Sequence, residues 1–290
     1  MKVKSGFTLI ELLVVIAIIA LLLSVIMPSL NMAKRKAAGV VCTSNEKQLS
    51  LAWTLFAADN DEEIVDGQPD NDDDGFTNYP GYGRVANFVA HPLTPPNGGA
   101  RLSLEGRILG LQTGGLWPYL ESYQIWHCPG DRRNAKNERR YGYRTYSIGA
   151  AYSRMAANIT STGEQDVFVT KTSQIKNPGS KFVFLEEMDV QAEYNDNTWN
   201  IFLQRSAPQW FDPVAVWHGD SSTFGYADGH AERHKWVGSL VKERADFGAA
   251  VALLDQGKNQ KIASVPTDSQ NDMEDWNWIT KHYVPRPYNR

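Results

Sequence analysis

The first feature of the chain is a long apolar stretch near its N-terminus. Residues 7–27 are apolar apart from Thr8, Glu11 and Ser24. As an α-helix this stretch extends about 31 Å at 1.5 Å per residue, which is enough to cross the hydrocarbon core of a bilayer. The pattern therefore predicts a membrane-spanning helix over residues 7–28. Because a carboxylate inside a membrane is costly, Glu11 indicates a functional role.

The helical pattern continues beyond the apolar stretch. Residues 29–58 contain no proline and carry apolar side chains at helical spacing, although Asn45 and Gln48 interrupt them. We expect this amphipathic half to pack on a globular head. The apolar positions of the stripe are Leu30, Ala33, Ala37, Val41, Leu51, Ala52, Leu55 and Phe56.

The remaining residues, 59–290, predict a globular head with long loops. Residues 59–115 are rich in acidic residues, Gly, Pro and Asn, a composition typical of loops with few strands. Residues 181–185 are mainly apolar and follow Pro178-Gly179, which predicts a buried strand. A long helix followed by turns and antiparallel strands indicates the α+β class, with the helix packed on an antiparallel β-sheet.

The Asp228-Gly229 pair predicts a β-hairpin over residues 223–236, because Asp-Gly favours the type I′ turn. Alternation along the two strands would place two sets of side chains on opposite faces. One set is Phe224, Tyr226 and Ala231, and the other is His230, Glu232 and His234. Two histidines four residues apart on a strand lie about 14 Å from each other, too far for one metal ion, so we expect the second face to be solvated.

Composition and charge are those of an ordinary globular protein attached to this helix. Of the 290 residues, 42% are hydrophobic and 21% are charged, with a formal net charge of −4. A weakly acidic chain is poorly suited to bind phosphate backbones, so no nucleic-acid partner is expected. The two cysteines, Cys42 and Cys128, would form a disulfide in an oxidising compartment if their Cα atoms lay within about 7 Å; the sequence leaves both states open.

The segment Gly6-Phe7-Thr8-Leu9-Ile10-Glu11 follows a short leader that contains Lys2 and Lys4. This segment resembles the N-terminus of type IV prepilins and type II secretion pseudopilins. The resemblance implies that a prepilin peptidase removes the leader, residues 1–6, after Gly6 and that the new amine of Phe7 is methylated. It also implies a pilin-like fold.

The same resemblance implies a non-enzymatic filament subunit. Its partners would be identical or related pilin subunits, an inner-membrane assembly platform and the lipid bilayer. Before assembly the chain would cross the inner membrane once, with its head in the periplasm, and in the filament it would be periplasmic or extracellular. Glu11 would pair with the Phe7 amine of a neighbouring subunit, which aligns the subunits and relieves the buried charge. The sequence does not distinguish a pilus from a secretion pseudopilus.

His218 precedes Asp228-Gly229 by an interval of nine residues. This spacing resembles the H-X9-DG motif of a group of prepilin-type proteins, and residues 42–48, 128–131 and 146–149 resemble further blocks of that group. A catalytic interpretation pairs His218 with Asp228 or Asp220 as acid, base or metal ligand. We favour a turn at Asp228-Gly229 and a His218 bonded to nearby loop backbone, because no nucleophile or second carboxylate lies at a motif spacing.

The acidic segment after residue 69 offers a calcium hypothesis. Asp70, Asp72 and Asp74, followed by Gly75, reproduce the start of a calcium-binding loop. The bidentate Glu expected later is absent, because Gly81 occupies its place. The alternative is a solvated acidic loop.

Tryptophans in polar, turn-rich segments raise a second alternative function. These are Trp199, Trp210, Trp217, Trp276 and Trp278. They would form either a carbohydrate- or partner-binding surface on a pilin-anchored module, or the filling of a loop-rich core, which we favour. A tethered hydrolase that uses His218 and Asp228 is the remaining alternative.

Overall fold

The computed structural model describes most of the chain between residues 8 and 286. The described ranges are 8–68, 74–79, 81–96, 98, 103–120, 122–131, 143–158, 163, 166–188, 198–203, 208–245 and 263–286. A long apolar helix packed against antiparallel sheets confirms the α+β class.

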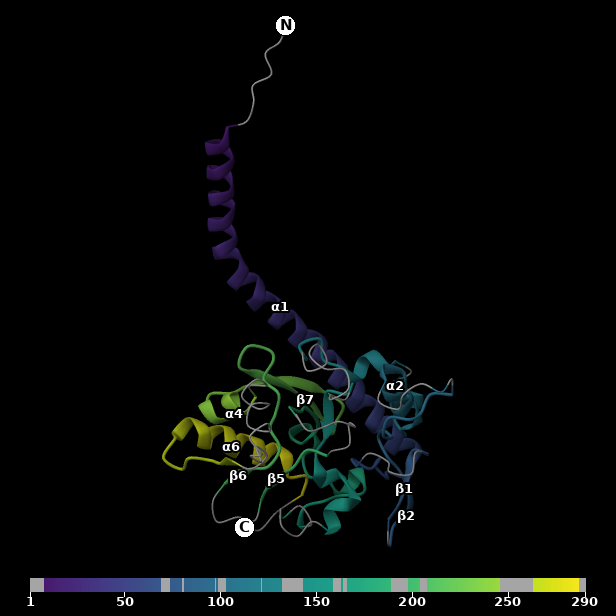
Figure 1. Ribbon diagram of the computed structural model, residues 1–290. Helices are drawn as coiled ribbons and strands as arrows, with labels where there is room; N and C mark the ends of the chain where they lie inside the picture. The colour runs from purple at the N-terminus through teal and green to yellow at the C-terminus, as the bar shows by residue number, and fades with distance from the viewer. Residues whose placement is uncertain are drawn as a thin grey trace.

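Helix α1, Leu9–Asp59, is the longest element and projects from the head (Figure 1). Residues 8–37 are exposed along its free part, which is long and apolar enough to cross a membrane. Pro28 lies inside the helix, where its ring removes a backbone hydrogen bond, and the helix curves between its free end and the head (Figure 1). The predicted single helix through both halves is confirmed.

The C-terminal half of α1 packs on the head through a face that shares only part of the predicted stripe, since Ala52 and Phe56 are buried as predicted. Val41, Leu51 and Leu55 are exposed, whereas the polar residues Asn45 and Glu46 are buried. The prediction is wrong at these positions because α1 carries an apolar face that does not meet the head. The buried residues of α1 are Gly39, Cys42, Asn45, Glu46, Leu49, Ser50, Ala52, Trp53, Phe56 and Ala57.

The core of the head is a four-stranded antiparallel sheet with the spatial order β3-β4-β7-β8. Its strands are β3 Tyr146–Ile148, β4 Phe182–Glu186, β7 Ser221–Tyr226 and β8 Ala231–Lys235. Helix α1 covers one face so closely that a Cβ at Gly225 of β7 would lie 2.3 Å from Ser50 Oγ. Helix α6, Gln270–Tyr283, packs against the other side, where the rings of Tyr283 and Phe182 are 5.8 Å apart. The strand predicted over residues 181–185 is confirmed as β4.

The predicted hairpin is also confirmed, since β7 and β8 are joined through Asp228-Gly229 and Gly229 has φ +91°. The predicted faces are wrong. Phe224 pairs directly with Glu232, and Ser222 pairs with His234. Directly paired residues of an antiparallel sheet point to the same face, so Glu232 and His234 share the face of Phe224.

The register of the hairpin explains this difference. A two-residue turn would pair Tyr226 with Ala231, whereas the structure pairs Gly225 with Ala231. A shift of one residue moves every side chain of a strand to the other face. As a result His234 is only partly exposed and stacks on Trp278 of α6, with ring centroids 3.6 Å apart.

The other described elements are short. Helix α2, Leu104–Thr113, is capped by Ser103 and lies in the region predicted as loop with few strands. Its single cap and Gly-rich sequence gave too weak a signal for a helix. The rest are β1 Phe76–Tyr79, β2 Gly83–Ala86, α3 Trp117–Leu120, η1 Tyr123–Trp126, η3 Ala150–Tyr152, η4 Arg154–Asn158, η6 Thr172–Gln174, η7 Pro178–Ser180, β5 Ile201–Phe202, β6 Gln209–Trp210, α4 Ser239–Arg244 and β9 Ala263–Ser264.

The tryptophans of the polar segments belong to the core. Trp199, Trp210 and Trp276 are at most 3% exposed, and Trp217 and Trp278 are partly buried against the same clusters. Their edge-to-face contacts join β5, β6 and α6 into one aromatic cluster beside the sheet. The core interpretation is confirmed, and these rings do not form an exposed binding surface.

Candidate functional site

The N-terminal end of α1 is closed by its own side chains. The backbone N–H and the hydroxyl of Thr8 both donate to Glu11 Oε2 at 2.8 Å, and Glu11 N–H donates back to Thr8 Oγ1 at 3.3 Å. This capping box satisfies groups that a helix end leaves without partners. Gly6 and Phe7 lie outside the described residues. In the single chain, the carboxylate of Glu11 therefore binds locally.

A second feature is the exposed apolar surface of α1. It covers the free part, from Leu9 onward, and continues beside the head as Val40, Val41, Leu51 and Leu55. At 100° per residue these last positions fall on one side of the helix, opposite the buried side. An apolar surface of this extent is typical of a membrane or subunit contact.

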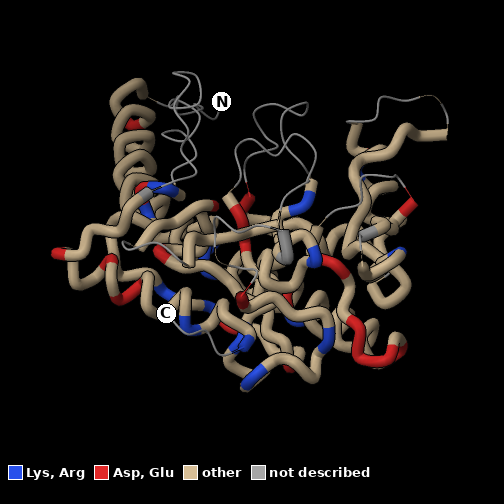
Figure 2. Tube along the Cα trace, turned by 90° about the horizontal axis from the view of Figure 1, so that it is seen from below, with Lys and Arg blue, Asp and Glu red and all other residues tan. Residues whose placement is uncertain are grey.

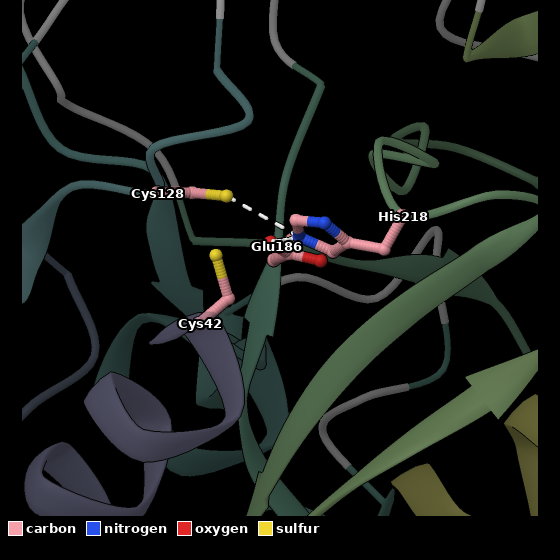
Figure 3. Close-up of side chains that lie close together, drawn as sticks. All are labelled: Cys42, Cys128, Glu186 and His218. Atoms are coloured by element: carbon pink, nitrogen blue, oxygen red, sulfur yellow. Dashed lines mark hydrogen bonds and ion pairs between the residues drawn. The ribbon is translucent and has the colours of Figure 1, made fainter. Parts of the chain in front are cut away.

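The head contains a compact cluster of four chemically active side chains (Figure 3). Cys42 comes from α1, Cys128 from the turn after η1, Glu186 from the end of β4, and His218 from the loop before β7. One ligand-type atom of each residue lies within 4.8 Å of all the others. Figure 3 shows the four side chains pointing toward one another.

Hydrogen bonds orient the imidazole of His218. Its Nε2 lies 2.8 Å from Glu186 Oε1 and 3.3 Å from Cys128 Sγ. Its Nδ1 lies 3.3 Å from the backbone carbonyl oxygen of Arg35. A carbonyl only accepts, so Nδ1 carries a proton and donates to it, and Nε2 is directed into the cluster.

Backbone N–H donors hold two of the other three groups, Glu186 and Cys128. The N–H of Thr223 donates to Glu186 Oε2 at 2.9 Å, which leaves Oε1 for the cluster. The N–H of Gly130 donates to Cys128 Sγ at 3.2 Å within the Cys128-Pro129-Gly130 turn. A Cβ at Gly130 would lie 2.9 Å from His218 Cε1, so a larger residue there would force the imidazole ring to shift.

The cluster is closed to solvent and strongly polar. Cys42, Cys128 and Glu186 are 0% exposed and His218 is 1% exposed. A hydrogen bond from Cys128 lowers the pKa of Cys42, whereas burial raises the pKa of Cys128. Burial lowers the pKa of His218, but hydrogen bonds with Cys42 and Glu186 outweigh it and raise that pKa to about 10. The interior thus favours an ionised sulfur beside a protonated imidazole.

Glu46 adds another buried carboxyl one helical turn after Cys42 on α1. It is 0% exposed, and neither oxygen accepts a hydrogen bond of ordinary geometry from a described residue, although the Thr223 hydroxyl lies close to it. Burial, followed by the negative charges of Glu186 and Cys42, raises the pKa of Glu46 well above its ordinary value. Such an uncompensated group is expensive and calls for a physical explanation.

Among the described residues, the hydrogen bonds of the His218 side chain do not involve Asp228 or Asp220, with which the catalytic interpretation paired it. Its bonded partners are Glu186, Cys128 and Arg35, whereas Asp228 Oδ1 contacts His230 Nδ1 at 2.5 Å on the exposed turn. The backbone contact expected for His218 is present, but it comes from α1 and not from a nearby loop.

The other predicted site residues are the two cysteines of the possible disulfide and the three aspartates of the calcium hypothesis. Cys42 and Cys128 lie side by side as free thiols. Of the calcium candidates, Asp70 and Asp72 are outside the described residues, and Asp74 is half exposed and pairs with Arg84 at 2.6 Å.

Sequence reasoning missed Glu186 as a member of the cluster. The available signal was an acid that directly continues the apolar run 182–185 in a predicted buried strand. A carboxylate in that position is rare without a partner.

Residues 1–27 match the family model of the prokaryotic N-terminal methylation motif. This match agrees with the basic leader, the apolar helix and the Glu11 position described above. It covers the leader and α1 as far as Met27, and the head lies beyond it. No curated protein and no solved structure matches the chain. The methylation motif therefore supports a prepilin-like, membrane-anchored protein with a processed N-terminus.

Proposed function

We propose that the chain is a non-enzymatic subunit of a type IV pilus-like or type II secretion pseudopilus filament. Prepilin peptidase cleaves it after Gly6, and its N-terminal helix assembles with other subunits. The observation that carries this proposal is the free, exposed and apolar part of α1, which bears the methylation motif. A helix of this kind is unstable in water and needs either lipid or other helices around it.

The assembly step centres on Glu11. In the single chain its carboxylate accepts from Thr8, its one hydrogen-bond donor among the described residues. Cleavage creates a charged amine at Phe7, which is a stronger partner for a carboxylate than a neutral hydroxyl. When a subunit is added, Glu11 of one subunit gives up its local contact with Thr8 and pairs with the Phe7 amine of its neighbour. This ion pair therefore forms where both helices leave the bilayer.

The exposed side of α1 beside the head supplies the second contact. Val40, Val41, Leu51 and Leu55 continue the apolar surface outside the membrane. In a bundle of parallel helices these side chains pack against α1 of the next subunits. The basic residues 34–36 lie where the free part meets the head, at the base of the projecting helix (Figure 2), and suit lipid headgroups before assembly.

The decisive experiment compares Glu11→Ala with Ser24→Ala in the native cell. Both variants remove one polar group from the apolar helix, but Ser24 only donates to the carbonyl of Leu21 within its own helix. We expect Glu11→Ala to be cleaved normally and to be lost from filaments, while Ser24→Ala assembles. Gly6→Val should block cleavage. Normal assembly of Glu11→Ala would overturn the scheme.

Mass spectrometry locates the product. Chains that begin with methylated Phe7 in mechanically sheared surface material identify a pilus. The same chains confined to membrane and periplasm identify a pseudopilus. Chains that retain residues 1–6 in both fractions would refute processing at Gly6.

A further inference from the structure

We propose that Cys42, Cys128, Glu186 and His218 bind one zinc ion that fastens α1 to the head. This inference goes beyond filament assembly and rests on the head alone. The four residues come from four separate segments, and each contributes a donor atom of a type that zinc accepts.

The ligand set selects the class of metal. Thiolate and imidazole together suit zinc, whereas oxygen ligands alone would suit calcium or magnesium. A carboxylate in the fourth position disfavours Cu(I), which prefers soft donors throughout. Two sulfurs, one nitrogen and one oxygen around a small space fit the tetrahedral sites in which zinc is bound.

The geometry needs only small adjustments. Bond lengths of about 2.0–2.3 Å place the donor atoms of a tetrahedral zinc site roughly 3.3–3.8 Å from one another. The four donor atoms already lie within 4.8 Å, with the His218 nitrogen 3.3 Å from the Cys128 sulfur and 2.8 Å from the Glu186 oxygen. Slight separation of the last pair admits an ion at the centre of the cluster.

The surrounding contacts are those of a prepared metal site. Metal-binding histidines generally donate their second N–H to a carbonyl or carboxylate, as His218 Nδ1 does to Arg35. Thr223 fixes the second oxygen of Glu186, and the Gly130 N–H donates to the Cys128 sulfur. These three contacts leave one donor atom of His218, of Glu186 and of Cys128 turned inward.

The charge of the bound state is compatible with a divalent ion. Zinc binds cysteine as the thiolate, so in the bound state Cys42, Cys128 and Glu186 contribute three negative charges to a closed interior. A divalent cation offsets two of these charges directly, where solvent is excluded. Binding releases the thiol protons to solvent and involves no redox step.

The burial of the four ligands indicates a structural and not a catalytic role for the ion. Every ligand is at most 1% exposed, so a substrate has no direct access to the metal. Four protein ligands and a closed surrounding are typical of structural zinc, in contrast to catalytic zinc, which retains an open position. The ion would join α1 to the turn after η1, to β4 and to the loop before β7.

The test uses the full chain, purified in detergent under reducing conditions without chelators. Metal analysis should find one zinc per chain. Titration of the metal-free protein with Co²⁺ should give the visible absorption of tetrahedral cobalt and a sulfur-to-cobalt charge-transfer band, both of which Zn²⁺ removes. Failure of the wild-type chain to bind either ion would overturn the proposal.

Variants assign the ligands. Cys42→Ser, Cys128→Ser and His218→Gln should each lose stoichiometric zinc, whereas His230→Gln, at an exposed histidine outside the cluster, should retain it. Glu186→Gln keeps the side-chain shape and should shift the cobalt spectrum and weaken binding by at least 10-fold. If the cysteine variants fold and retain the zinc affinity of the wild type, the assignment of the ligands is refuted.

Thiol chemistry separates zinc from a disulfide. Protein from native membranes is alkylated before and after reduction and analysed by mass spectrometry. We expect both cysteines to be reduced and protected from alkylation until zinc is chelated. A Cys42–Cys128 disulfide in the native protein would overturn the zinc site, because its sulfurs would no longer be ligands.

Discussion

Replacement of His234 by phenylalanine should make the head less sensitive to acid. The His234 ring stacks on Trp278 with centroids 3.6 Å apart and meets the edge of Trp236 at 4.6 Å. Its Nε2 is buried and has no hydrogen-bond partner in the part of the chain that the structure describes. Burial, with a contribution from the nearby His282, lowers the pKa of His234 from 6.5 to about 4. Folding therefore favours the neutral ring.

The sign and size of the expected change in unfolding free energy follow from the difference in proton binding between the folded and the unfolded chain. Between pH 6.5 and pH 4 the unfolded chain binds a proton at His234 that the folded chain does not, so stability falls as the pH falls through this range. A shift of about 2.5 pKa units corresponds to roughly 3.4 kcal/mol at most. Because the ring is partly exposed, solvent screening reduces this to about 1–2 kcal/mol.

The assay is urea unfolding of the full chain in detergent, followed by tryptophan fluorescence at pH 7 and pH 4.5. Phenylalanine keeps the aromatic stack and does not titrate. We expect the wild type to lose about 1–2 kcal/mol more than His234→Phe on acidification. Protons bound by the cysteine cluster affect both proteins equally and cancel in the difference.

His230→Phe is the matched control, since His230 is exposed and pairs with Asp228 at 2.5 Å. That variant should gain no stability at low pH. If the unfolding free energies of the wild type and of His234→Phe depended equally on pH, the reasoning would be refuted. Such a result would mean that the His234 ring has the same pKa in the folded and in the unfolded chain.

Three further predictions concern other parts of the chain. Gly229→Ala should destabilise the head by about 1–3 kcal/mol in the same assay, because its φ of +91° strains any side chain. Thr8→Ala should leave cleavage intact and reduce filament yield less than Glu11→Ala does, because only the capping hydroxyl is removed. The calcium hypothesis predicts that Ca²⁺ raises the melting temperature of protein from which a chelator has removed bound metal. The double variant Asp70→Asn/Asp72→Asn should lose this response.

Local sequence signals predicted the elements that depend on near neighbours. Apolar length identified the free part of α1, and the run at 182–185 with Pro178-Gly179 before it identified β4. Asp228-Gly229 located the hairpin, but not its register, which depends on a single additional turn residue. Helix α6 was not predicted, because its apolar positions Trp276, Ile279 and Tyr283 are separated by polar residues that dominate its average.

The candidate sites divide in the same way. The N-terminal segment is contiguous in sequence, so its resemblance to prepilins could indicate the roles of Gly6, Phe7 and Glu11, and the methylation motif matches the same stretch. The buried cluster is not contiguous: Cys128 and His218 are 90 residues apart and Glu186 and His218 are 32 apart. Only the register of the sheet and the position of α1 bring these residues together, and neither can be derived from spacing.

The error in the predicted stripe of α1 has a physical reason that links the two sites. On the head-facing side of α1, Leu49, Trp53 and Phe56 pack into the core, and the polar residues Asn45 and Glu46 are buried as well. The proposed zinc ion at Cys42 would fasten this side of the helix near the point where the polar residues interrupt its apolar contacts. On the opposite side, Leu51 and Leu55 are exposed. The proposed filament would cover them with α1 of neighbouring subunits. Both proposals therefore account for a helix that carries apolar residues on two sides, each from one side of the helix.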